Sequence, residues 1–465
     1  MTSANQRCGG PVSRRNFLQV GTLGLSGLSL ADMYRLRAAA ESANVAGPDP
    51  ETSVIFIWLP GGPPHMETYD MKPDAPSDYR GAFNPIHTAA SGLDICEHLP
   101  LQAKTAGRFN IIRSIAHKFA DHGGGHKRFL TGRDPKTPTG FVNDAPAAAT
   151  IVSKMREHRK VGVPNYIVGA NSGRHKVDVY SFGAAYLGPS YTAFTVPGDP
   201  SSEKFEIQNL GLSKDMANRL DDRKTLLGSL DRLRRDVDAS GAMSAMDEFN
   251  SRAVDMLTSP ACREAFDLSR ESPKLREKYG LHSWGQRALM ARRLVEAGSS
   301  FVTMVMENPY QSGIPYASDG VYNWDSHAVN CHLFNDALNR MPIYDRAIST
   351  LIDDLYDRGL DKKVMLVVTG EFGRTPRITY AKDRPGRDHW PQAMSVLVSG
   401  GMRTGQVIGS TNAKGEHPKD RPLTPNDLWA TIYRHLGIDT EHAFPDHAGR
   451  PMPILPFGEP IEELL

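Results

Sequence analysis

Four groups of histidine and acidic residues, the last of which also contains an arginine, stand near the ends of apolar runs in this sequence. They are, in chain order, His65, Glu67 and Asp70, then His117, Asp121, His122 and His126, then Asp325 and His327, and last Glu371, Arg374, Asp388 and His389. Imidazole and carboxylate groups together are the ligands of zinc, manganese or iron, whereas carboxylates alone suit magnesium or calcium. The four groups therefore predict a divalent-metal site, with zinc or manganese favoured and magnesium or calcium as the alternative.

The apolar runs beside these groups have the composition of buried strands. They lie at 54–59, 166–168, 301–305, 364–368 and 394–398. Continuous apolar runs are typical of parallel strands that are covered on both faces, and helical patterns lie between several of them. This alternation predicts an α/β fold with a mostly parallel sheet and helices on both faces. Because ligands of such sheets bind beyond the carboxyl ends of the strands, we expect the four groups to converge there.

Two features of these groups leave alternatives open. His122 and His126 are four residues apart and would share one face of a helix, but the glycines at 123–125 favour a loop, at least at its start. Arg374 either holds an anionic group through two hydrogen bonds or locks Glu371 in a salt bridge.

Residues 213 to about 297 differ from the rest of the chain, because they are charged, almost free of strand patterns and helical in pattern. Leu226, Leu230, Leu233 and Val237 make one apolar stripe there. We interpret 213–297 as a helical insertion packed on the α/β core.

The first 46 residues predict export of the protein. Arg14 and Arg15 precede a weakly apolar run that ends at Leu30 and is too short to span a bilayer as a helix. Small residues at 38–40 and 45–46 suit a signal peptidase. This pattern is typical of a twin-arginine signal, and a tail with a chance arginine pair is the alternative. We expect passage through the twin-arginine translocon and a periplasmic or extracellular site of action.

The remaining chain, 47–465, is close to neutral, with 49 lysine and arginine residues against 51 acidic ones. This balance, without a basic run, gives no electrostatic case for binding nucleic acid. No apolar stretch after Leu30 is long enough for a transmembrane helix. Cys96, Cys262 and Cys331 lie far apart and predict neither a disulfide framework nor a zinc knuckle.

The later motifs resemble a known exported family. They are Trp-Asp-Ser-His at 324–327, Gly-Glu-Phe-Gly-Arg-Thr-Pro at 370–376, Gly-Arg-Asp-His-Trp-Pro at 386–391 and Gly-Gly-Met at 400–402. Together with the N-terminal signal they resemble the family called domain of unknown function 1501. That family is similar to the alkaline phosphatase and sulfatase superfamily, whose members hydrolyse phosphate or sulfate esters at one or two metal ions. The resemblance implies an alkaline phosphatase-like fold over 47–465 and a small anionic, sulfated or phosphorylated substrate.

The resemblance also implies metal ligands. Asp325 and His327 fit one Asp-and-His pair of the superfamily, and Glu371 stands where an Asp-His-Gly motif has its Asp. Phe372 replaces a metal-binding histidine, and the first strand ends without the usual ligand Asp. The candidate ligands are therefore Asp325, His327, Glu371, His389 and Asp388, with His65 and Asp70 as substitutes from the loop after the first strand.

The superfamily nucleophile is missing. Phe-Leu-Thr-Gly at 129–132 resembles the end of the sulfatase signature, which places His122 at the nucleophile position and His126 at the arginine position. One hypothesis is a hydrolase in which water acidified by the metal attacks directly, with His122 or His126 as general base and Arg374 stabilising the developing charge. A second is a metal- or ligand-binding relative without turnover. A third is a structural or carbohydrate-associated surface protein whose histidines and carboxylates only stabilise loops.

Overall fold

The apolar sequence that follows the predicted signal forms β1 (Ser53–Trp58), and every residue of this strand is buried. The computed structural model describes residues 51–159, 162–207, 259–315 and 318–465. Within them, β1 lies inside an eight-stranded sheet of order β14-β4-β13-β8-β1-β7-β5-β6. It pairs in parallel with β7 (Phe301–Val305) and β8 (Val364–Thr369). The predicted mostly parallel sheet is confirmed.

One long strand runs against the others. β13 (Met394–Ser399) pairs antiparallel with both β8 and β4 (Phe109–Ile115). β14 (Val407–Ile408) lies parallel beside β4, while β5 (Tyr166–Ala170) and β6 (Phe194–Pro197) complete the opposite side of the sheet. Because β13 is reversed, the residues that precede it reach the edge where β1, β4 and β8 end.

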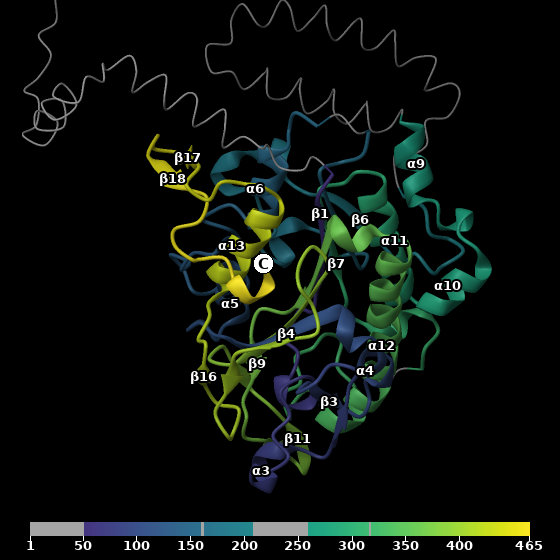
Figure 1. The fold of residues 1–465 in the computed structure, drawn as a ribbon, viewed down its shortest axis with the longest axis vertical. Helices are drawn as coiled ribbons and strands as arrows, with labels where there is room; N and C mark the ends of the chain where they lie inside the picture. The colour runs from purple at the N-terminus through teal and green to yellow at the C-terminus, as the bar shows by residue number, and fades with distance from the viewer. Residues whose placement is uncertain (1–50, 160–161, 208–258, 316–317) are drawn as a thin grey trace, which may run out of the picture. The chain divides into compact units, whose positions relative to one another are not determined.

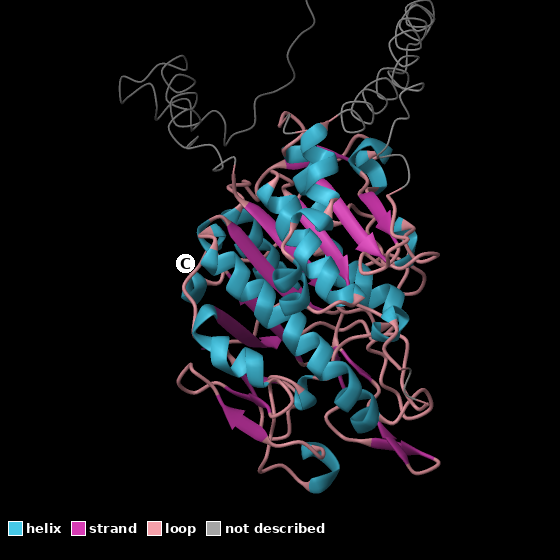
Figure 2. Ribbon diagram, turned by 90° about the vertical axis from the view of Figure 1, so that its right-hand side faces the viewer, coloured by secondary structure: helices cyan, strands magenta, loops and turns pink. Residues whose placement is uncertain are grey.

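Helices α4 (Pro100–Thr105), α11 (Ser283–Glu296) and α12 (Leu333–Asp357) cover one face of the sheet. Figure 2 looks onto this side, with helices lying in front of the strands. Ile55 and Ile57 of β1 belong to the apolar core beneath these helices.

The other face is covered by α5 (His122–Thr131), α6 (Ala148–Met155) and α13 (Pro425–His435). Phe56 of β1 stacks on Trp429 of α13 with ring centroids 5.6 Å apart in this second core. Alternate residues of β1 thus enter different cores, as the period of two along a strand requires. Figure 1 shows the strands between the two helical layers, so the predicted helices on both faces are confirmed.

The described part of the predicted helical segment is helical. It contains α9 (Pro260–Phe266), α10 (Pro273–Tyr279) and α11, while 208–258, with the predicted apolar stripe, lie outside the described residues, as does the predicted signal at 1–46. α11 packs on the sheet and belongs to its covering layer. None of the described helices is both long and apolar enough for a membrane crossing.

Short strand pairs lie outside the eight-stranded sheet. β9 (Gly373–Arg374) pairs antiparallel with β12 (His389–Trp390), and β10 (Thr379–Ala381) forms a hairpin with β11 (Arg384–Gly386). Besides several 3-10 turns, the described residues contain the short helix α3 (Ser77–Arg80) and the short strands β2 (Pro85–His87), β3 (Asp94–Cys96), β15 (Ser410–Thr411), β16 (Pro418–Asp420), β17 (Ala443–Pro445) and β18 (Pro451–Pro453). The β9–β12 pair ties the loop after β8 to the segment before β13.

Candidate metal centre

Side chains from four separate segments meet at the edge where the parallel strands end. His122 begins the helix that follows β4, and Asp325 lies in the long loop after β7. Glu371 follows β8, and His389 lies in β12 just before the reversed strand β13. The structure therefore brings together residues that are up to 267 positions apart in the chain.

Helix α5 forms in spite of its three glycines. Asp121 caps it, because its side chain accepts hydrogen bonds from the backbone nitrogens of Gly123 at 2.9 Å and Gly124 at 3.3 Å. The first turn is therefore helical, and His122 and His126 project from the same side toward Glu371.

The glycines of α5 serve close packing. A Cβ atom added at Gly123 or Gly124 would lie 2.3 Å from a backbone carbonyl oxygen of the 138–140 segment. One added at Gly125 would lie 2.9 Å from the Phe372 ring. Any larger side chain would push the helix away from the strand edge, and His122 would move with it.

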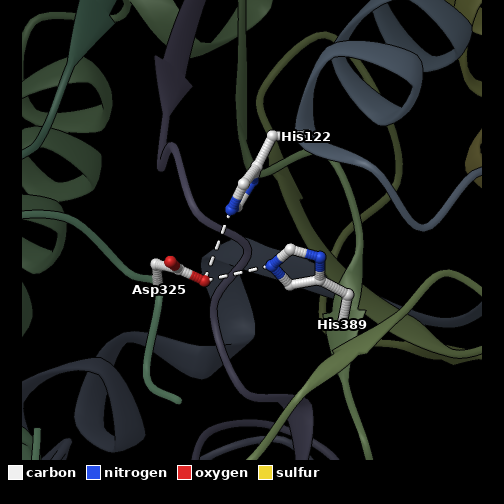
Figure 3. Close-up of side chains that lie close together, drawn as sticks. All are labelled: His122, Asp325 and His389. Carbon is white, nitrogen blue, oxygen red and sulfur yellow. Dashed lines mark hydrogen bonds and ion pairs between the residues drawn. The ribbon is translucent and has the colours of Figure 1, made fainter. Parts of the chain in front are cut away.

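The centre of the site is one oxygen of Asp325. The Nε2 atoms of His327 and His389 each lie 3.1 Å from Oδ1 of Asp325, and Nε2 of His122 lies 3.4 Å from it. The two Nε2 atoms of His327 and His389 are 2.9 Å apart. Figure 3 shows His122 and His389 pointing at the Asp325 carboxylate from different directions.

The opposite ring nitrogens of these histidines are held by oxygens. Nδ1 of His389 donates to the Ala120 carbonyl at 2.6 Å, and Nδ1 of His327 donates to Asp388 at 2.6 Å. Nδ1 of His122 donates to Glu371 at 2.7 Å. A proton on Nδ1 leaves the Nε2 of a neutral imidazole with a lone pair, which is the arrangement found around protein-bound metals.

This arrangement fits a metal ion. Two Nε2 lone pairs at 2.9 Å repel each other unless a proton or a cation lies between them. Zinc–nitrogen bonds of about 2.0–2.1 Å in a tetrahedral site put neighbouring ligand atoms roughly 3.3 Å apart. The spacings of 2.9–3.4 Å around Asp325 are close to that value.

A second group of possible ligands, made of His122, His126 and Glu371, adjoins the group formed by Asp325 and the three histidines that face it. Glu371 is fully buried, its Oε1 lies 3.4 Å from Nε2 of His126, and it accepts hydrogen bonds from the Gly61 backbone nitrogen. Nδ1 of His126 donates to the Tyr180 carbonyl at 3.1 Å. His122, His126 and Glu371 could also hold a cation, and His122 belongs to both groups.

The electrostatics of both groups favour positive charge. Burial would raise the pKa of Asp325 and of Glu371, but the imidazoles around each carboxyl outweigh burial and hold both pKa values well below their usual range. Burial lowers the pKa of His122, yet its hydrogen bonds to the two carboxylates raise that pKa to about 9. Two ionised carboxylates that share one imidazolium would equally stabilise a divalent cation.

Arg374 pairs with Asp325, not with Glu371. Its Nη2 donates to Oδ1 of Asp325 at 2.6 Å, and its other N–H groups donate to the carbonyls of Gly61, Gly62 and Arg387. The guanidinium is fully buried. It therefore fixes the Asp325 carboxylate against the loop that follows β1.

Three other predicted ligands, His65, Asp70 and Asp388, lie outside the group formed by Asp325 and the three histidines that face it. His65 donates from Nε2 to the Gly415 carbonyl at 2.9 Å, and burial lowers its pKa to about 4. Asp70 is paired with Lys72 at 2.8 Å, and Asp388 contacts Nδ1 of His327. His65 and Asp70 thus find partners elsewhere, and Asp388 orients a histidine that faces Asp325.

Sequence reasoning missed the contribution of Gly61 and of Phe372. Gly61 has a φ of +105°, and a Cβ there would lie 2.5 Å from the Asp325 backbone nitrogen, so only glycine lets the two loops approach. The Phe372 ring lies 4.6 Å from that of His389 and 5.4 Å from that of His122. The two glycines directly after a buried strand were the available signal for this close approach.

Fold and site together define an α/β protein whose strand edge carries a histidine–carboxylate cluster with the geometry of a metal centre. The chain belongs to the family described as protein of unknown function (DUF1501), whose model matches residues 51–465. This match confirms the family that the motifs indicated. No curated protein matches the sequence.

The chain is similar to several solved structures. The PsFucS1 sulfatase from Pseudoalteromonas sp. is 11% identical, with 94% of this chain and 75% of that chain covered and a TM-score of 0.37. The zinc complex of the C-terminal periplasmic domain of EcEptC from Escherichia coli is 10% identical, with 83% of each chain covered and a TM-score of 0.35. The phosphonate monoester hydrolase SpPMH from Silicibacter pomeroyi is 12% identical, with 88% and 76% covered and a TM-score of 0.31. At these TM-scores, none of the likenesses assigns a residue role to this chain.

Proposed function

We propose that this protein is an exported, metal-dependent hydrolase of phosphate or sulfate esters. One observation carries the proposal: three imidazoles direct Nε2 at one oxygen of Asp325 while an oxygen holds Nδ1 of each ring. Their side chains and that of Asp325 remain 18 to 27% exposed, so the cluster is accessible from solvent.

Asp325, His327 and His389 are the proposed metal ligands. Their ligand atoms lie within 3.1 Å of one another, and three protein ligands leave a fourth position open, as in catalytic zinc sites. A divalent ion bound there would acidify water and polarise an ester oxygen. Asp388 orients His327, and Arg374 positions Asp325.

His122 is the proposed general base in the metal-loaded protein, because a cation on Asp325 would repel the His122 imidazolium and lower the pKa that the two carboxylates raise in its absence. Glu371 holds its Nδ1–H, so the proton to be removed would go to Nε2, which faces Asp325 and His389. This is the way a buried carboxylate orients a catalytic histidine. His126 is almost fully buried and contacts the same oxygen of Glu371, so it helps to hold the carboxylate that orients His122.

A second candidate follows from the position of His122. Its Nε2 is only 3.4 Å from the Asp325 oxygen, and as a fourth ligand it would close the site. Closed four-ligand sites are typical of structural zinc. The protein would then bind metal without turnover.

The His122→Ala variant separates the two candidates. An open site predicts that this variant keeps its metal and loses hydrolysis of every ester that the wild type cleaves, in a panel of phosphate and sulfate mono- and diesters. A closed site predicts loss of the metal itself. His87→Ala, in which an exposed histidine paired with Asp94 is removed, serves as the matched control. A wild-type protein that is loaded with metal and cleaves no ester contradicts the hydrolase proposal.

Export remains part of this proposal and rests on the N-terminal pattern alone. Production with a twin-arginine translocon and without one tests it, since only the first strain should release the protein to the periplasm. Periplasmic protein in both strains would contradict the assignment to that route.

A further inference from the structure

A second polar group lies at the ends of the neighbouring strands β5 and β7. Glu307 follows β7 and is fully buried, and Arg174 lies in the turn after β5. Nε of Arg174 lies 3.0 and 3.1 Å from the two carboxylate oxygens of Glu307, and the Tyr180 hydroxyl donates to the same carboxylate. The buried Glu307 carboxylate is therefore already paired with Nε of Arg174.

The rest of the Arg174 guanidinium remains available. Within the described ranges, neither Nη atom of Arg174 hydrogen-bonds to another residue, and the side chain is 40% exposed. Two parallel Nη–H groups match the oxygens of a sulfate, phosphate or carboxylate group. This differs from Arg374, whose N–H groups donate to protein oxygens.

The orientation of Arg174 is fixed by its surroundings. Its Cζ lies 5.3 Å from the centroid of the Tyr180 ring and 5.4 Å from that of Tyr322. The Tyr322 hydroxyl accepts a hydrogen bond from Asn171, whose own oxygen accepts one from the buried Arg287. An arginine held this way loses little further side-chain freedom when it binds an anion.

Arg174 is near the metal centre. The Tyr180 carbonyl accepts the Nδ1–H of His126, and the Tyr180 ring centroid is 6.1 Å from that of His126. One tyrosine ring therefore separates the guanidinium from the histidine that contacts Glu371. Arg174 therefore lies outside the cluster formed by Asp325 and its histidines, with the Tyr180 ring between its guanidinium and His126.

We infer that Arg174 is a specificity-determining residue that binds a second oxyanion of the substrate. This inference rests on the proposed function and narrows it to esters with another sulfate, phosphate or carboxylate group besides the one that is cleaved. The shared chemistry is a tetrahedral or planar oxyanion that accepts two N–H groups.

The test compares ligands that carry one or two anionic groups. The probes are pyranoside monosulfates, the matching disulfates, the matching sulfated uronates and the phosphate counterparts. Binding to the zinc-loaded protein is measured by calorimetric titration, and KM and kcat are measured for each probe that is cleaved. We expect the wild type to prefer the doubly anionic ligands by roughly tenfold. The three kinds of second group distinguish sulfate, phosphate and carboxylate as the preferred anion.

Two variants and one control decide the outcome. Arg174→Gln should abolish the preference while binding of the singly anionic ligands stays unchanged. Arg174→Lys keeps a charge beside Glu307 for folding, lacks the paired Nη groups and should lose most of the preference. Arg358→Lys is the control, because Arg358, the C-cap residue of α12, pairs with Asp354 at 2.9 Å and is 33% exposed.

The results separate this inference from the proposed function. Equal affinity of the wild type for both ligand classes, or an unchanged preference in the lysine variant, overturns the inference even if esters are cleaved. An Arg174-dependent preference in binding without turnover of any ester supports the inference and contradicts the hydrolase proposal.

Discussion

Histidines follow both β1 and β4, in segments that contain neighbouring glycines, yet the structure gives them opposite surroundings. His65 has one nitrogen on a backbone carbonyl, and its neighbour Asp70 is paired with Lys72. His122 instead places one nitrogen on Glu371 and the other toward Asp325. The comparison shows that the direction of the second ring nitrogen, not the position after a strand, separates a structural histidine from one that can hold a metal or move a proton.

The largest expected effect comes from removing Asp325. Asp325→Ala should lose its metal, and the free energy of unfolding should fall by about 3–5 kcal/mol because Arg374 is left as an uncompensated buried charge. Elemental analysis and urea denaturation measure the two effects. Full metal content in a folded Asp325→Ala protein would show that the metal does not bind at Asp325.

A smaller effect is expected from the outer partner of His327. Asp388→Asn should weaken metal binding on the order of 10–100-fold, because the ring loses the carboxylate that orients it. Stability should barely change, since the Asp388 side chain is half exposed. Competition with a metal indicator gives the affinity, and equal affinities of variant and wild type would show that Asp388 does not tune the site.

Replacement of His65, the histidine that follows β1, should leave the metal in place. His65→Gln is expected to keep wild-type metal content and to lower the free energy of unfolding by about 1 kcal/mol, because the hydrogen bond to Gly415 is weakened. Loss of metal in this variant would place His65 in the metal centre and remove the distinction between the two regions.

The smallest expected effect is on the pH dependence of the free energy of unfolding. Burial lowers the pKa of His65 from 6.5 to about 4, so the unfolded chain binds more protons between those values. The contribution of neutral His65 to stability is present above pH 6.5 and is lost as pH falls toward 4. The pH slope of stability over this range should therefore be shallower in His65→Gln than in the wild type, and identical slopes would contradict the assignment of a buried neutral imidazole.

Much of the sheet could be predicted from sequence because its strands are continuous apolar runs. β4 was not, since Asn110, Arg113 and Ser114 interrupt its apolar pattern. Asn110 instead hydrogen-bonds the neighbouring segment at Arg403 and Gln406. The reversal of β13 was also hidden, because an apolar run has no direction. Only the pairing with β4 and β8 reveals it.

The candidate site was predictable in residue type but not in arrangement. The motifs indicated Asp325, His327, Glu371 and His389, which the structure brings together with His122. The oxygens that hold Nδ1 of His389 and His126 are backbone carbonyls, which residue identity does not reveal. The glycines of α5 favoured a loop, because the tight packing that requires them comes from a distant segment.

Elemental analysis of the protein purified without chelator tests the central claim most directly. The measurement compares the wild type with His389→Ala, in which one of the three proposed ligands is missing. We predict a stoichiometric transition metal in the wild type and its loss from a folded His389→Ala protein. A folded wild type without metal, or equal metal content in both proteins, would contradict the assignment of the Asp325 cluster as a metal centre.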